Sequence, residues 1–290
     1  MTTREPVSEI FLPEVPADAP PPVTRKPRVW TVFVAYAAAI VVMLILAVAV
    51  LLVAIAGTGF AAIESAVSSP FSLFGFFLGS FVAMAGTALL SAWLSPTPWR
   101  QRLRLLVVPM PPQAVIVGVI GVLGIGMAVG CLDGLGLVPS SPTLEYIATA
   151  MNSLSPLALA VANLAIGILP GTAEELLFRG YIQTRLCARW GMARGITCTA
   201  LMFGIIHLDL VQGAYAVIVG LFLGYMTERY GSILPAMIAH ATNNMASGLL
   251  SWHPDGRLAN GLGLMITLAI TGACFLYLRR RLPFSGDLRS

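Results

Sequence analysis

Two adjacent carboxylates and an arginine lie within an otherwise apolar stretch of this 290-residue chain, at Glu174, Glu175 and Arg179. Ionised groups at the depth of a lipid bilayer are costly unless they are paired or hydrated, so they are candidates for a functional site. In a helix, Glu175 and Arg179 are four residues apart and face each other. Glu174 is turned by about 100° from Glu175 and points elsewhere. The spacing therefore predicts that the arginine holds one carboxylate and leaves the other free for chemistry.

Later apolar stretches carry further polar residues at helical spacing. Phe203 and His207 are four residues apart, as are His240 and Asn244. This spacing places His240 and Asn244 on one helix face, with Cβ atoms within about 6 Å of each other. Two of the three histidines are thus predicted to lie in membrane helices, whereas His253 is expected in a loop outside the membrane.

These residue types are suited to hydrolysis. A carboxylate and an imidazole that share a water molecule can deprotonate it for attack on a carbonyl carbon. A second imidazole beside a carboxamide can donate hydrogen bonds to the oxyanion that forms. The same atoms could hold zinc instead, with Glu174, His207 and His240 as candidate ligands, because two histidines, one glutamate and a water form a known catalytic set. The sequence has no HExxH motif and these ligands would come from three helices, so the spacing leaves both versions open.

The composition indicates that these residues lie in a membrane protein. Apolar residues make up 57% of the chain and charged residues only 10%, against about 25% charged in a typical soluble domain. Mean hydropathy is +0.85. The basic residues form no clustered face, which argues against a nucleic-acid partner. The four cysteines have no close pairing, so we expect neither a disulfide framework nor a zinc knuckle.

We predict an all-α, polytopic fold of about eight transmembrane helices with both termini cytosolic. The arginines support this orientation, because with the amino terminus inside, the opposite side holds only Arg257. We expect a disordered cytosolic tail over residues 1–28, a membrane domain over 29–282 with its catalytic core helices at 155–250, and a cytosolic tail over 283–290. The predicted spans are, approximately, 30–55, 71–94, 114–131, 157–181, 193–208, 211–226, 233–250 and 261–277.

The orientation gives the expected depth of the site. Glu174 and His240 lie about 10 Å, and His207 about 20 Å, from the cytosolic ends of their predicted spans. We therefore expect a site in the cytosolic half or near the middle of the membrane, in a water-filled cavity that faces the cytosol. The loop over 132–156 falls on the non-cytosolic side, where 143–153 is expected to form a short surface helix.

Three motifs, in this order on successive predicted spans, resemble those of the CPBP family, the Abi-type CAAX proteases and bacteriocin-processing enzymes that include the CAAX prenyl endopeptidase. They are Glu174-Glu175-x-x-x-Arg179, Phe203-x-x-x-His207 and His240-x-x-x-Asn244. The resemblance covers about residues 155–250, and no motif position is missing. It implies an intramembrane endopeptidase with an eight-helix fold.

The resemblance also implies roles for these residues. It assigns water activation to Glu174 and His207 and the oxyanion hole to His240 and Asn244, while the second carboxylate and the arginine of the first motif brace the site. Both metal-dependent and metal-free glutamate mechanisms are compatible with it, so zinc stays a candidate cofactor. The implied partners are membrane lipids and a peptide or protein substrate, including a lipidated or membrane-associated tail, in a bacterial inner membrane. The alternative is a non-catalytic immunity or scaffold protein that binds a peptide in the same cavity.

Structural interpretations compete with these roles. Thr172 and Glu175 fit a capping box, in which a helix restarts at Thr172 and Glu175 caps it. Arg179 could merely extend its charged end toward the cytosol. Phe203 is expected to pack and orient His207, not to react.

Four further polar residues near these motifs are expected to be structural. Asn243, turned by about 100° from its neighbour in the third motif, is expected to make a helix–helix hydrogen bond. Asp209 is expected to mark a turn between two spans. Glu228 and Arg229 are expected at the cytosolic surface, where charge costs little.

Overall fold

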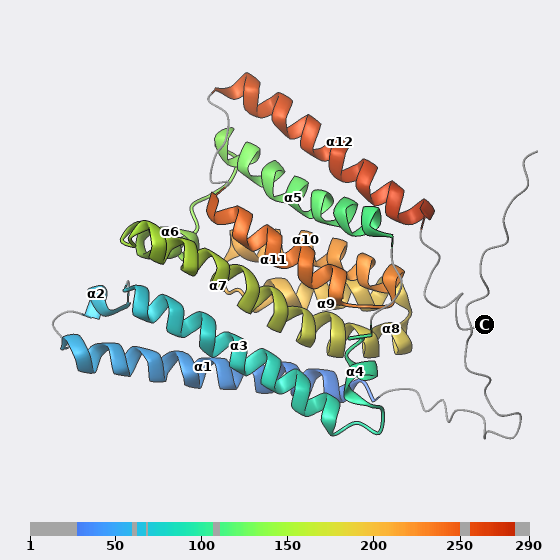
Figure 1. The fold of residues 1–290 in the computed structure, drawn as a ribbon, viewed down its shortest axis with the longest axis horizontal. Coiled ribbons are helices and arrows are strands. Elements are labelled where there is room, and N and C mark those ends of the chain that lie inside the picture. The colour runs from blue at the N-terminus through green and yellow to red at the C-terminus, as the bar shows by residue number, and fades with distance from the viewer. Residues whose placement is uncertain (1–27, 60–62, 68, 107–110, 250–255, 282–290) are drawn as a thin grey trace, which may run out of the picture.

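Every regular element in the described part of the chain is a helix, which confirms the all-α prediction (Figure 1). The computed structural model describes residues 28–59, 63–67, 69–106, 111–249 and 256–281. The predictions for the two terminal tails and for His253 fall outside these residues. The elements are α1 (Trp30–Thr58), α2 (Ile63–Val67), α3 (Pro70–Trp93), α4 (Trp99–Arg102), α5 (Pro112–Gly134), α6 (Pro142–Asn152), α7 (Pro156–Glu174), the π-helix η2 (Glu175–Gln183), α8 (Thr184–Trp190), α9 (Met192–Ile205), α10 (Leu210–Tyr230), α11 (Leu234–Leu249) and α12 (Arg257–Arg281).

Among the described residues, six helical stretches are long and apolar enough to cross a membrane. They are α1, α3, α5, the continuous run from α7 to α8, α10 and α12. The other two predicted spans coincide with α9 and α11, which have 14 and 16 residues. At 1.5 Å per residue these helices reach about 21 and 24 Å, less than the ~30 Å of a bilayer core. The chain is thus multi-pass, whereas the count of eight spans and the orientation of the termini remain predictions.

The long helices pack side by side in a bundle (Figure 1). In this view α1 and α3 form one side and α5 and α12 the other, with the remaining long helices between them. Helix α3 packs on α1, α7 and η2, and α5 packs on α11 and α12. One buried apolar cluster joins η2 to α1, α3 and α9, and a second joins α5, α10 and α12. Outward-facing residues of the long helices, such as Ile45 and Leu52 of α1, are large and apolar, as contact with lipid requires.

Helix α7 continues without a break into the π-helix η2. It runs through Pro170 and Thr172, so the capping-box interpretation of Glu175 is wrong: no helix restarts at Thr172. A π-helix has one more residue per hydrogen-bonded ring than an α-helix and is found frequently at functional sites. All nine residues of η2 are buried. The two carboxylates therefore stand at the junction between α7 and η2.

Glycines bring α11 close to this junction. A Cβ atom on Gly171 would lie 2.8 Å from the backbone nitrogen of Ala241, and one on Gly167 would collide with the side chain of Met245. Small residues four positions apart permit such close helix approach in membrane proteins. Because Ala241 follows His240 and Gly171 precedes Glu174 by three residues, the approach brings these two functional candidates together.

Two predictions about surface segments had different outcomes. Helix α6 forms where a short surface helix was expected, and all its residues are exposed or half-buried except Ala150 and Met151, which pack in a cluster with Leu73 of α3. Glu228 and Arg229 are each only 8% exposed, although they were expected at a surface. Their charges are tolerated at this depth because both side chains form hydrogen bonds with other residues of the bundle.

Candidate active site

A cavity of about 820 Å³ contains the candidate residues of all three motifs in its wall. Helices α1, α3, α5, α6, α7, α9, α10 and α11 contribute to its lining. Five predicted site residues line it: Glu174, Phe203, His207, His240 and Asn244. The other two, Glu175 and Arg179, lie behind this wall and are fully buried.

His240 lies between the two adjacent carboxylates. Its Nε2 atom is 3.5 Å from Oε2 of Glu174, and its Nδ1 atom is 2.8 Å from Oε1 of Glu175. Since an ionised carboxylate can only accept hydrogen bonds, Nδ1 of His240 carries a proton and donates a hydrogen bond to Glu175. This leaves Nε2 directed toward Glu174 at the cavity. The spacing of the motifs did not predict the bond between His240 and Glu175.

The predicted pairing of Glu175 with Arg179 is present. Arg179 Nη1 donates to Glu175 Oε1 over 2.7 Å, and both side chains are fully buried. The guanidinium carbon of Arg179 lies 4.5 Å from the centre of the Phe203 ring. The interpretation of Arg179 as a residue that extends to the cytosol is therefore wrong.

Several atoms of this buried pair are left without a hydrogen bond within the described structure. They are Oε2 of Glu175 and Nε and Nη2 of Arg179. Each such group costs about 1–3 kcal/mol, more when charged. A buried ion pair is often no more stabilising than well-packed apolar residues, so this pair is weak evidence for a purely stabilising role.

His207 is not inside a membrane helix, which corrects the prediction. Helix α9 ends at Ile205, and His207 lies in the turn that follows, next to Leu208 with its positive φ of 53°. The spacing to Phe203 still matters, because His207 Nδ1 lies 2.8 Å from the Phe203 carbonyl oxygen and donates to it. That bond leaves Nε2 of a neutral His207 as an acceptor at the cavity.

Phe203 packs at the centre of the site, as expected. Its ring meets those of His207 and His240 edge-on, with centroids 5.0 and 5.8 Å apart. The ring of Phe178 from η2 packs against it at 5.0 Å. Phe203 thus fixes the positions of both imidazoles and of Arg179 by contact.

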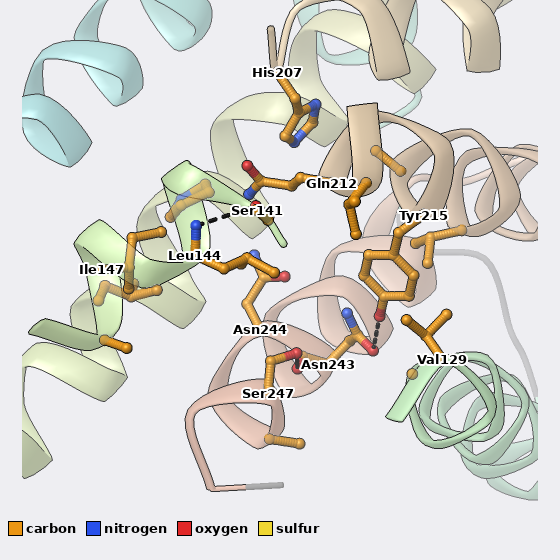
Figure 2. Close-up of a pocket in the computed structure, with 18 of the residues that line it drawn as sticks. Val129, Ser141, Leu144, Ile147, His207, Gln212, Tyr215, Asn243, Asn244 and Ser247 are labelled. Atoms are coloured by element: carbon orange, nitrogen blue, oxygen red, sulfur yellow. Dashed lines mark hydrogen bonds between the residues drawn. The ribbon is translucent and has the colours of Figure 1, made fainter. Parts of the chain in front are cut away.

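The cavity wall also carries polar residues that sequence reasoning missed or treated as structural (Figure 2). Asn243 makes the expected helix–helix hydrogen bond, because Tyr215 donates its hydroxyl to Asn243 Oδ1 over 2.8 Å. Figure 2 shows Gln212 and Tyr215 from α10 opposite Asn244 from α11. Nothing in the spacing of Gln212 or Tyr215 distinguished them from other residues of α10.

The cavity extends away from the arginine-rich end of the bundle. Its walls are the second half of α5, the start of α10 and helix α6, and none of its lining residues is an arginine. The buried η2 side chains Leu177 and Phe178 do not line it either. The expectation of a cavity open to the arginine-rich, cytosolic side is therefore wrong. With the predicted orientation, the cavity lies toward the other side.

The side chains do not form an evident metal centre. Within the described residues no group of three His, Cys, Asp or Glu side chains is placed to hold a metal ion. His240 directs Nδ1 to Glu175 and His207 directs Nδ1 to a backbone carbonyl, which leaves both Nε2 atoms free, as in histidines that bind metals. In this arrangement, however, Glu174, His207 and His240 do not come together as a set of three ligands, so no step is derived through a metal.

Comparison with known proteins agrees with the three motifs. Residues 156–246 match the model of the family described as type II CAAX prenyl endopeptidase Rce1-like. This segment contains all seven predicted site residues and confirms the resemblance to the CAAX proteases. The family implies a protease, and with the apolar helices it indicates an integral, multi-pass membrane protein. No curated protein and no solved structure matches the chain.

Proposed function

We propose that this protein is an intramembrane endopeptidase that hydrolyses a peptide bond with a water molecule activated by Glu174. The observation that carries the proposal is the position of His240 between the carboxylates of Glu174 and Glu175, at the wall of a cavity. The family match over residues 156–246 gives the reaction class.

We assign water activation to Glu174 and His207. Both line the cavity, and Glu174 is the carboxylate that Arg179 does not hold. Glu174 accepts a proton from water while the water oxygen bonds to the carbonyl carbon of the substrate. The same proton then passes to the amide nitrogen as the carbon–nitrogen bond breaks, which releases an amine and a carboxylic acid. Nε2 of His207 is the second acceptor that holds this water.

We assign stabilisation of the oxyanion to His240 and Asn244. The charges of Glu174, Glu175 and Arg179 sum to one negative charge, so a protonated His240 makes the cluster neutral. Its Nδ1–H is fixed by Glu175, and its Nε2–H is then available to donate to the oxyanion. The Asn244 amide, one helical turn further along α11, supplies a second donor.

The substrate is proposed to be a peptide or the tail of a membrane-associated protein. Much of the cavity lining is apolar, including Met43, Phe77, Met84 and Leu159, which suits a lipidated or hydrophobic chain beside the peptide bond. We place the protein in a bacterial inner membrane. No specific observation favours the alternative, a non-catalytic immunity or scaffold protein.

The test is comparative peptidomics of membranes from cells that contain the wild-type protein, Glu174→Gln or Arg189→Gln. Arg189 is an exposed residue of α8 that does not line the cavity, and it serves as the control for loss of one charged side chain. The expected result is a set of fragments present with wild type and Arg189→Gln but absent with Glu174→Gln at equal protein abundance. Identical fragments in all three samples would contradict the proposal.

A further inference from the structure

Arg185 is a buried cation at the opposite end of the bundle from the cavity. It is only 7% exposed, and its guanidinium carbon lies 3.8 Å from the centre of the Tyr181 ring. Its Nη1 atom is buried without a hydrogen-bond partner in the described structure. A buried guanidinium without an anion is costly, so this arrangement calls for a negatively charged partner.

A second guanidinium lies beside it. Leu103, which follows α4, packs against η2, because its backbone oxygen would lie 3.1 Å from a Cβ atom on Gly180. Arg102 precedes Leu103 and is therefore held beside η2, near Tyr181, on whose ring Arg185 packs.

Arg102 is anchored by its own loop. Its Nε donates to Ser95 Oγ over 2.8 Å, and its Nη2 donates to Thr97 Oγ1 over 3.0 Å. These bonds orient the guanidinium without neutralising its charge, since both acceptors are hydroxyl groups. The loop thus holds one cation next to another.

Glu228, a buried acidic residue near the end of α10, is engaged with other partners. Glu228 accepts from both terminal nitrogens of Arg104, at 2.7 and 3.2 Å, and from Gln183 at 2.9 Å. Among the described residues, neither Arg102 nor Arg185 forms an ion pair with a carboxylate. Two neighbouring cations therefore share a place that lacks an anion.

We propose that Arg185 and Arg102 together bind the phosphate group of an anionic phospholipid. Two planar guanidinium groups suit the tetrahedral oxygens of a phosphate, which they can contact in pairs. The position favours a lipid over other anions, because exposed Trp99 and Trp190 flank these arginines in sequence, as at a membrane interface. Basic residues beside a membrane span attract anionic headgroups. This site is separate from the cavity and does not depend on peptidase activity.

Native mass spectrometry of the full-length, detergent-purified protein tests the proposal. The probes are dioleoyl-phosphatidylglycerol, dioleoyl-phosphatidylcholine and inorganic phosphate, and the variants are Arg185→Gln, Arg102→Gln and Arg189→Gln. Arg189 is the matched control, because it lies one helical turn from Arg185 on α8 and is exposed. We expect one tightly bound phosphatidylglycerol that either Arg185→Gln or Arg102→Gln weakens about tenfold and Arg189→Gln about twofold or less.

Other outcomes overturn the proposal. Equal losses for Arg185→Gln and Arg189→Gln would mean non-specific attraction of lipid to basic residues. Tight binding of inorganic phosphate without preference for phosphatidylglycerol would mean a site for a free anion. A gain in phosphatidylglycerol binding on deletion of residues 2–27 would mean that acidic residues of the chain itself occupy the site. Arg102→Gln keeps the test decisive if Arg185→Gln fails to fold, because Arg102 is half-buried.

Discussion

The Nδ1–H group of His240 in α11 donates a hydrogen bond of 2.8 Å to the carboxylate of Glu175 in η2. The same carboxylate oxygen accepts from Arg179. The second carboxylate of the Glu174–Glu175 pair thus does two things: it neutralises a buried cation and sets the orientation of an imidazole. This arrangement leaves Nε2 of His240 and the carboxylate of Glu174 next to each other at the cavity.

Loss of Glu175 is expected to damage both stability and activity. Glu175→Ala leaves Arg179 buried and unpaired, which should cost about 3–5 kcal/mol of unfolding free energy. Glu175→Gln keeps an acceptor for His240 and should cost less. Thermal unfolding in detergent measures both. Equal melting temperatures for Glu175→Ala and wild type would contradict the account.

Replacing the whole pair separates its two roles. The double variant Glu175→Leu/Arg179→Met should be more stable than Arg179→Met alone, because no uncompensated charge is then buried. It should nevertheless be inactive, since His240 has lost the acceptor that orients it. A stable double variant with full peptidase activity would show that Glu175 does not position His240.

The oxyanion role of Asn244 predicts a kinetic effect without a structural one. Asn244→Ala should lower kcat by about 10²–10³-fold with little change in KM, because the amide acts on charge that develops only in the transition state. Thr242→Ala, at a half-buried position on the same helix that does not line the cavity, serves as the control. A change confined to KM would instead indicate a role in substrate binding.

The stability that Asp209 contributes should be lost at acidic pH. Asp209 accepts from the Gln212 backbone N–H at 2.9 Å and from the Ser141 hydroxyl at 2.8 Å, and these bonds lower the pKa of its carboxyl below the usual 3.8. A lowered pKa contributes stability that is present above pH 3.8 and is lost as the pH falls through the folded-state value. Wild type should therefore melt at a higher temperature than Asp209→Asn at pH 6, and the difference should shrink below pH 3.8. Asn is an equally good helix cap, so a difference independent of pH would contradict this assignment.

Much of the framework was predictable from the sequence, because long apolar stretches can only be helices in a membrane. Each predicted span coincides with a helix, and the pairing of Glu175 with Arg179 followed from i,i+4 spacing. The shortness of α9 was missed because hydropathy does not mark where a helix ends. As a result, His207 was assigned to a helix and lies in a turn.

Long-range contacts could not be predicted from spacing. The bond between Glu175 and His240 joins residues 65 positions apart and depends on the close packing of α11 against α7 at Gly171. The π-helix has no composition of its own that separates it from an α-helix. The partners of Glu228 are Gln183, at the end of η2, and Arg104, on the loop before α5, so its burial could not be predicted from spacing either.

The central claim is that the cluster around Glu174 and His240 adds water to a peptide bond. The most direct measurement is mass spectrometry of peptides released when isolated membranes are incubated in H₂¹⁸O. We predict fragments with one ¹⁸O atom in their new carboxyl terminus for wild-type membranes and the loss of these fragments for Glu174→Gln membranes. Labelled fragments of the same identity and amount from both membranes would contradict the claim.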